Sequence, residues 1–210
     1  MKNSKSYLIA VIVLLVVLVI ASVVYSKIVK PSLDNRTISV TTEVTIDNKE
    51  LNLSFSYPSG DSAYALLEPP VAPEEADGLK KVYILMDSKK YFEFQAATEL
   101  VDTPPTVSIF ILEEKKTGEA IDEENRSARL LAWAERNPQY TSFFEKSAEP
   151  ELVKVDGVDA YHYTTEKNYK YDMYLISYKG NIYVFAGQFE DELDDIHGMY
   201  QKLISSVIFS

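Results

Sequence analysis

The feature that most constrains this chain is an uninterrupted apolar stretch near its N-terminus. Residues 7–25 read YLIAVIVLLVVLVIASVVY and contain no charged side chain. As an α-helix this run would extend about 28 Å, close to the thickness of the hydrocarbon core of a bilayer. Tyr7 and Tyr25 stand at its two ends, where tyrosine rings favour the headgroup region. The sequence therefore predicts a transmembrane helix, with the membrane contacted through Tyr7–Tyr25.

A cleaved signal peptide is the alternative reading of this run. Its apolar region would usually be about 7 to 15 residues long and would end in small residues, for which Val19-Ile20-Ala21 is a passable match. A lipoprotein anchor is excluded because the chain contains no cysteine. We therefore expect a single-pass signal anchor at residues 7–25, preceded by a short tail at 1–6.

The orientation of this anchor depends on few charges. Two lysines precede the helix, while Lys27, Lys30 and Arg36 follow it, so the positive-inside rule is nearly balanced. A short tail before a long apolar run is typical of a signal anchor. We expect the N-terminus in the cytoplasm and the domain outside, at a prokaryotic cell membrane.

The rest of the chain is acidic and free of cysteine. Residues 26–37 form a polar linker, and 38–210 are enough for one domain with its own core. Beyond residue 30 there are 17 basic and 32 acidic residues, a formal charge of −15. That charge argues against nucleic acid as a partner, because phosphate binding needs a basic surface. The lack of cysteine excludes disulfides, zinc–thiolate sites and cysteine nucleophiles.

Alternation of apolar and polar residues predicts a mainly antiparallel sheet. The expected strands are 38–46, 51–57, 82–86, 91–97, 106–112, 152–155, 158–164, 171–178, 182–185 and 207–209. Asp156-Gly157 and Lys179-Gly180-Asn181 predict hairpin turns. The nearly all-apolar run at 107–112 predicts a central strand covered on both faces. The proline-rich residues 61–79 are expected to form an irregular loop.

Two soluble helices are expected, at 119–136 and about 190–204. Acidic residues crowd the start of the first helix and Arg136 stands at its end, as the helix dipole favours. Its expected apolar stripe comprises Ala128, Leu131 and Ala132, broadened by Leu130 and Ala134. In the second helix the stripe comprises Leu193, Ile196, Tyr200 and Leu203. The predicted fold class is α+β, as an α/β/α-type domain whose sheet is flanked by two main helices.

Several short motifs, in this order of elements, resemble the PsbP-like superfamily. They are FSYP at 55–58, VDGVDAY at 155–161, YKGNIY at 178–183 and SVIF at 206–209. The superfamily includes the extrinsic PsbP subunit of photosystem II, a Ran-binding nuclear import factor and many exported prokaryotic proteins of unknown role.

The resemblance spans roughly residues 38–210, and its motifs mark turns and the boundaries of strands and helices. It implies an antiparallel sheet with helices on its faces, and a binding or assembly role without catalysis. One departure is that an aromatic residue commonly follows the Tyr-Pro turn, whereas Asp61-Ser62-Ala63 stands here and the one tryptophan is Trp133.

The best candidate for a metal site is Glu190, Asp194 and His197. On a helix, their i, i+4, i+7 spacing would place two carboxylates and an imidazole on one face, a set suited to Ca²⁺, Mn²⁺ or Zn²⁺. The competing reading is that acidic residues at a helix N-terminus favour the dipole and keep the outer face hydrated. A divalent cation, Ca²⁺ or Mn²⁺, is therefore the one cofactor considered.

The chain is rich in tyrosine, with 15 residues. Those on the late strands could pair across the sheet or could form an aromatic face for a sugar or peptide ligand. The candidates for this face are Tyr161, Tyr163, Tyr174, Tyr178 and Tyr183.

Catalytic motifs are scarce. The chain has two histidines, His162 and His197, and neither a Gly-x-Ser-x-Gly elbow nor a glycine-rich phosphate loop. The leading hypothesis is a membrane-anchored, non-enzymatic binding or assembly module for a protein, metal or cell-envelope ligand outside the cytoplasm. The alternatives are an unrecognised hydrolase, with carboxylates clustered in a pocket, and a structural subunit of a membrane complex, with an exposed apolar patch.

Overall fold

The computed structural model describes residues 41–61, 63–71, 78–97, 102–114 and 123–210. The chain divides into Met1–Ile38 and Ser39–Ser210, and the described residues all belong to the second unit. The predicted membrane helix at 7–25, the linker at 26–37 and the first residues of the helix expected from 119 lie outside the described ranges. Within those ranges, no helix is long and apolar enough to cross a membrane.

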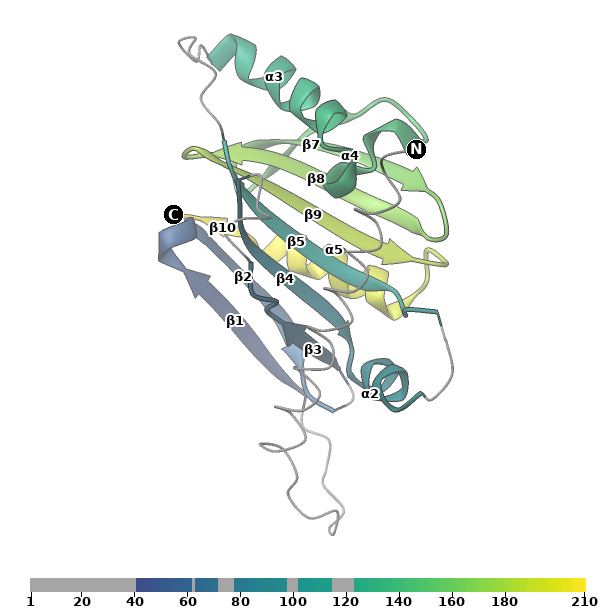
Figure 1. The fold of residues 1–210 in the computed structure, drawn as a ribbon. Coiled ribbons are helices and arrows are strands. Elements are labelled where there is room, and N and C mark those ends of the chain that lie inside the picture. Colours follow the sequence, from purple (N-terminus) through teal and green to yellow (C-terminus); the bar gives the residue numbers. More distant parts are fainter. Residues whose placement is uncertain (1–40, 62, 72–77, 98–101, 115–122) are drawn as a thin grey trace. The chain divides into compact units, whose positions relative to one another are not determined.

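One sheet of ten strands forms the centre of the domain (Figure 1). Its order is β1-β2-β3-β4-β5-β9-β8-β7-β6, with β10 paired to β2. All neighbours are antiparallel except β2 and β3, which meet in parallel at one residue pair. The strands are β1 Thr42–Asn48, β2 Leu53–Ser59, β3 Tyr64–Leu67, β4 Leu79–Asp87, β5 Thr106–Glu113, β6 Glu151–Val155, β7 Val158–Glu166, β8 Lys170–Tyr178, β9 Asn181–Phe189 and β10 Ile208–Phe209.

The predicted hairpins are confirmed. Asp156 and Gly157 join β6 to β7 with φ of 48° and 76°, and both values lie in the left-handed region that a type I′ turn requires. Lys179 and Gly180 join β8 to β9 in the same way, with φ of 45° and 75°. The primed turn matches the twist of the paired strands, which fixes their register.

Helices cover both faces of this sheet. On one face, α5 (Asp195–Ser206) packs on β2, β5 and β9, and its side chains join a core with Phe55 and Phe185. On the other face, α3 (Glu123–Arg136) and α4 (Pro138–Thr141) cover a second core that contains Leu175 and Val184. Successive residues of β9 alternate between the two cores. The expected mainly antiparallel α+β sheet with helices on both faces is confirmed, and β5 is its buried central strand.

A close approach between α5 and β9 holds the first of these cores together. The Tyr200 ring lies over Gly187, where an added Cβ would stand 2.6 Å from ring atoms. Its hydroxyl donates to the carbonyl of Phe185 at 3.1 Å. Tyr200 is fully buried, and burial raises its pKa well above the usual value. A glycine is therefore needed at position 187 because any side chain would displace the ring.

Two parts of the predicted fold are wrong between residues 61 and 97. The segment expected as a strand at 91–97 belongs to α2 (Ser88–Ala96), because the Asp87 carboxylate accepts a hydrogen bond from the backbone of Lys90 and caps a helix there. The segment expected as an irregular loop at 61–79 contains β3, which pairs with β4.

The apolar faces of the two main helices also differ from prediction. Among the α3 side chains that the structure describes, Leu130 and Ala134 are buried, whereas Ala128 and Ala132 are exposed. The second helix begins at Asp195 instead of about residue 190, and Leu193 before it is 91% exposed. A single polar turn at 190–194 therefore replaces the predicted first helical turn.

Candidate functional site

The later start of α5 separates the residues of the predicted metal site. Glu190 precedes the helix and Asp194 is its N-cap, so the helical spacing that grouped them with His197 does not exist. The Asp194 carboxylate accepts hydrogen bonds from the backbone amides of Glu190 and Asp191, at 2.8 and 2.9 Å. These two amides lower the pKa of Asp194. The carboxylate thus organises the polar turn before the helix.

Glu190 and Asp194 do line a small pocket, of about 180 Å³, together with Asp87, Asp195 and Lys90. His197 is not among its lining residues, because its ring points to β8. Across the described part of the chain, no group of three or more histidine or carboxylate side chains is arranged to hold a metal ion. Cation binding by Glu190, Asp194 and His197 stays a prediction. Calorimetric titration of the full chain with Mn²⁺ or Ca²⁺ tests it, and no heat at millimolar metal would remove it.

Both histidines of the chain converge on one buried carboxylate, Asp172 of β8. His162 Nε2 on β7 lies 2.6 Å from Oδ1 of Asp172, and His197 Nε2 on α5 lies 3.3 Å from Oδ2. The amide nitrogen of Gln201 also donates to Oδ2. The Asp172 side chain is 5% exposed. Two strands and a helix are therefore joined through a single charge.

Aromatic rings hold both imidazoles in place. His162 packs on Tyr174 with ring centroids 4.6 Å apart, and His197 stacks on Phe189 at 4.1 Å. The hydrogen bond to Asp172 is the largest influence on the pKa of His162 and raises it, while burial opposes this in part. The arrangement favours an imidazolium at position 162 that is paired with a buried carboxylate.

The five tyrosines proposed as one aromatic face lie on opposite faces of the sheet and so do not form a single surface. Ligand binding by any of them stays a prediction. Tyr174, Tyr178 and Tyr183 belong to the core under α5. Tyr161 and Tyr163 belong to the core under α3 and α4. Successive residues of a strand face opposite sides of the sheet. Of these five tyrosines, the two of β7 point to one face, and those of β8 and β9 point to the other.

Tyr163 and Tyr183 are structural residues. Each is buried, and their hydroxyls donate to the carbonyls of Thr141 at 2.8 Å and of Leu51 at 2.6 Å. The half-buried Tyr161 and Tyr178 instead line a pocket.

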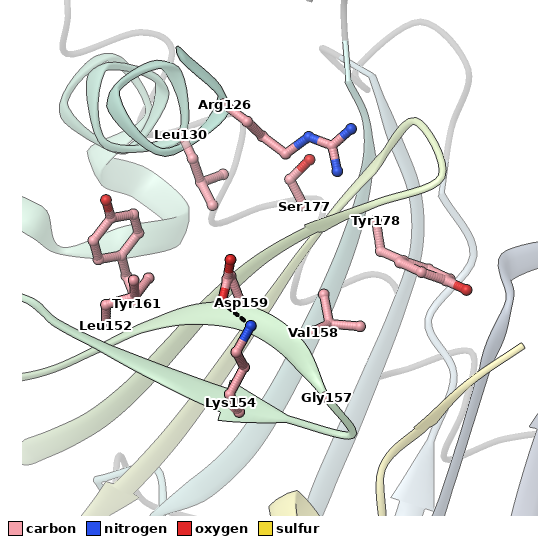
Figure 2. Close-up of a pocket in the computed structure, with 10 residues that line it drawn as sticks. All are labelled: Arg126, Leu130, Leu152, Lys154, Gly157, Val158, Asp159, Tyr161, Ser177 and Tyr178. Carbon is pink, nitrogen blue, oxygen red and sulfur yellow. Dashed lines mark ion pairs between the residues drawn. The ribbon is translucent and has the colours of Figure 1, made fainter. Parts of the chain in front are cut away.

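That pocket is a recess in which apolar and charged side chains meet. It has a volume of about 260 Å³ and lies between α3 and the β6–β7 hairpin, at the end of the sheet (Figure 2). The lining residues are Arg126, Leu130, Leu152, Lys154, Gly157, Val158, Asp159, Tyr161, Ser177 and Tyr178. Its apolar and aromatic side chains come from α3, β6, β7 and β8, and Leu152 of β6 is 58% exposed.

The charges of this pocket are unequal. Lys154 forms an ion pair with Asp159 across the hairpin, as Figure 2 shows. Arg126 is exposed and forms no ion pair with any carboxylate of the described residues. In Figure 2 its guanidinium lies above Ser177, whose hydroxyl donates to Glu114 at 3.0 Å. Within the described part of the pocket wall, Arg126 is therefore the cation that no carboxylate pairs.

The sequence alone predicted neither the cluster of two histidines around Asp172 nor the pocket between α3 and the β6–β7 hairpin. One signal for the histidine cluster was available, since Asp172 is the lone charge inside an otherwise uncharged stretch of β8, and such a charge usually has a partner. The pocket had no comparable signal, because it depends on how α3 lies over the hairpin.

No protein-family model matches the chain, and no curated protein matches its sequence. Among solved structures, the chain is similar to the solution structure of cyanobacterial PsbP (CyanoP) from Synechocystis sp. PCC 6803. The identity is 13% and the TM-score is 0.48, with 86% of this chain and 100% of that chain covered.

A second similar structure is a crystal structure from Bacteroides thetaiotaomicron VPI-5482. Its identity is 10% and its TM-score is 0.41, with 76% of this chain and 45% of that chain covered. At such identities, what this chain binds has to be inferred from its own side chains.

Proposed function

We propose that the domain is a non-enzymatic binding or assembly module whose docking site is the pocket between α3 and the β6–β7 hairpin. The observation that carries this proposal is the composition of the pocket wall, which combines exposed Leu152, two tyrosine rings and the exposed guanidinium of Arg126. Apolar contacts with a charge at the rim are typical of protein recognition sites.

The size of the pocket favours a partner protein over a free small molecule. Sites for small molecules usually measure about 300–1,000 Å³ and enclose most of the ligand. This pocket, of about 260 Å³, is below that range. A volume of this size suits one or two side chains of a protein that continues past the rim.

The histidine cluster supports a binding role over hydrolysis. Asp172 binds Nε2 of both imidazoles, and Nδ1 of His197 lies 3.3 Å from the carbonyl oxygen of Glu192, so the cluster links β7, β8 and α5 as a structural element. The lowered pKa of Asp194 favours the ionised carboxylate, whereas a general acid needs a raised pKa. An enzyme and a structural subunit of a membrane complex remain the alternatives, and the second would use the same docking surface.

We further propose that residues 7–25 tether this domain to the outer face of a cytoplasmic membrane. The apolar run has the length of a bilayer span, and the linker at 26–37 has only a dozen residues. A tether of that length keeps the pocket within a few nanometres of the membrane, which raises the effective concentration of membrane-bound partners.

Affinity capture from intact membranes with two matched leucine variants tests the binding role. Leu152 lines the pocket, whereas Leu193 lies before α5 and is also exposed. We expect Leu152→Glu to lose the co-purified partner and Leu193→Glu to retain it at the wild-type level. Equal recovery with both variants would contradict the proposal.

A further inference from the structure

We propose that the pocket and the free edge of β6 together bind an extended acidic segment of a partner protein, which adds to the sheet as a strand next to β6. This inference rests on the binding role proposed above and specifies the chemistry of the partner. The segment would place an apolar side chain against Leu152 and a carboxylate on Arg126.

The register of the hairpin identifies which backbone groups of β6 are free. Val155 and Val158 flank the two-residue turn, so they form a hydrogen-bonded pair. Such pairs alternate along an antiparallel ladder, which makes Val153 with Ala160 the next one. The N–H and C=O groups of Leu152 and Lys154 therefore point away from β7. Among the described strands, β6 is last in the sheet order and has no second neighbour.

The free edge and the pocket are continuous. Leu152 and Lys154 contribute their outward backbone groups to the edge and their side chains to the pocket. Strand addition combines such backbone pairing with side-chain pockets, which give affinity and specificity respectively. A strand next to β6 would therefore place its own side chains at the pocket rim.

Charge complementarity determines the kind of segment. Lys154 is paired with Asp159, so Arg126 is the cation of the described pocket wall that is left for a ligand. The chain as a whole has a formal charge of −11, so an acidic partner is repelled over most of the surface and attracted here. The strand at the other end of the sheet order, β1, carries Glu43 and Asp47 and no basic residue, whereas β6 carries Lys154 as well as Glu151.

Two matched synthetic peptides provide the probe. Each is a fluorescent eight-residue peptide of alternating threonine and leucine, with either one glutamate or one lysine in place of a central leucine, so that the charge and the neighbouring leucines face the same side of the strand. Fluorescence anisotropy measures their binding to the full chain in detergent micelles. We expect the glutamate peptide to bind about five-fold more tightly, as for a single exposed charge pair, and Arg126→Gln to abolish that difference. Equal binding of the two peptides to the wild type would overturn the acidic assignment.

A proline substitution tests the backbone pairing. Lys154→Pro removes both the lysine side chain and the outward backbone N–H. Lys154→Ala removes the side chain but keeps the N–H. We expect Lys154→Pro to bind the glutamate peptide at least about five-fold more weakly than Lys154→Ala. Thermal unfolding of the two variants checks that both are folded. Equal binding by folded Lys154→Pro and Lys154→Ala would overturn strand addition.

Failure of this inference can be distinguished from failure of the binding role. If Leu152→Glu loses the captured partner while Lys154→Pro and Lys154→Ala capture it equally, the binding role stands and strand addition is wrong. If Leu152→Glu retains the partner, the binding role itself is wrong. Cross-linking to a product of twice the mass of the chain would identify a second copy as the occupant and overturn the acidic segment.

Discussion

His162 and Asp172 lie on neighbouring strands, β7 and β8, and their side chains meet at 2.6 Å in the core under α5. Asp172 also accepts from His197 and Gln201 of α5, so the carboxylate joins the helix to the sheet. Removing one partner of a buried charge leaves the other desolvated and unpaired. The stability of this half of the domain should therefore depend on the charge of one imidazole.

The first prediction concerns pH. The pKa of His162 is raised by its hydrogen bond to Asp172, so the folded state binds the proton more tightly than the unfolded state. The resulting stability is fully present below the ordinary pKa of 6.5 and is lost as pH rises through the higher pKa of the folded state. We expect the free energy of unfolding, measured in urea, to fall over that window in the wild type.

His162→Gln is the matched variant for this measurement. It removes the proton while keeping a polar side chain that can donate to Asp172. We expect it to cost about 1–3 kcal/mol below the ordinary histidine pKa, and to cost less above the raised pKa. Other groups titrate in both proteins, so the difference between the two curves is the quantity to compare. A constant difference across the whole window would contradict the assignment.

The second prediction concerns Gly187. An alanine there would collide with the ring of Tyr200, which is fully buried between α5 and β9. We expect Gly187→Ala to destabilise the domain by about 1–3 kcal/mol, as overpacking does. The control is Gly198→Ala in α5, where an added Cβ meets no atom within 4 Å. It should be neutral or stabilise by up to about 1 kcal/mol, because alanine is the better helix former. If thermal unfolding shows Gly198→Ala to be less stable than Gly187→Ala, the packing of α5 on β9 in this structure is wrong.

The third prediction separates structural tyrosines from those at the pocket. Tyr163 is buried and donates to the carbonyl of Thr141, so Tyr163→Phe should cost about 1–3 kcal/mol and leave partner capture unchanged once folded. Tyr161 lines the pocket, and Tyr161→Ala should weaken partner capture more than it lowers stability. Chemical denaturation and affinity capture on both variants provide the comparison. If folded Tyr163→Phe no longer captures the partner, then Tyr163 takes part in binding and is not only a structural residue.

The fourth prediction concerns the tether and its orientation. Since the chain has no cysteine, a single Leu193→Cys substitution gives one exposed thiol on the domain. We expect a membrane-impermeant maleimide to label it on intact cells, and the protein to stay with the membrane after alkaline washing. Labelling only after cell lysis would place the domain inside, and release by the wash would contradict the anchor.

Local sequence signals predicted much of this fold. Asp156-Gly157 identified a hairpin because few residues other than glycine, asparagine and aspartate suit a type I′ turn. The apolar run of β5 identified a central strand because only a strand covered on both faces has that composition. These features depend on residues that are neighbours in the chain.

The errors arose where tertiary or capping interactions decide the structure. Residues 91–96 alternate weakly, and the hydrogen bond from Asp87 to the start of α2 outweighs that pattern. The helical spacing of Glu190, Asp194 and His197 failed because Asp194 binds the backbone before it and delays the start of α5. The sequence could not predict that Arg126 and Leu152 line the same pocket, because no local pattern indicates how α3 lies over the β6–β7 hairpin.

Photo-crosslinking from the pocket rim in living cells tests the docking site most directly. A photoreactive benzophenone side chain replaces Leu152, and the same group at Leu193 serves as the control. We predict a discrete cross-linked protein from position 152 that is absent from position 193 and is reduced when Arg126→Glu is added. Cross-links of equal yield from both positions, or none from position 152, would contradict a docking site between α3 and the β6–β7 hairpin.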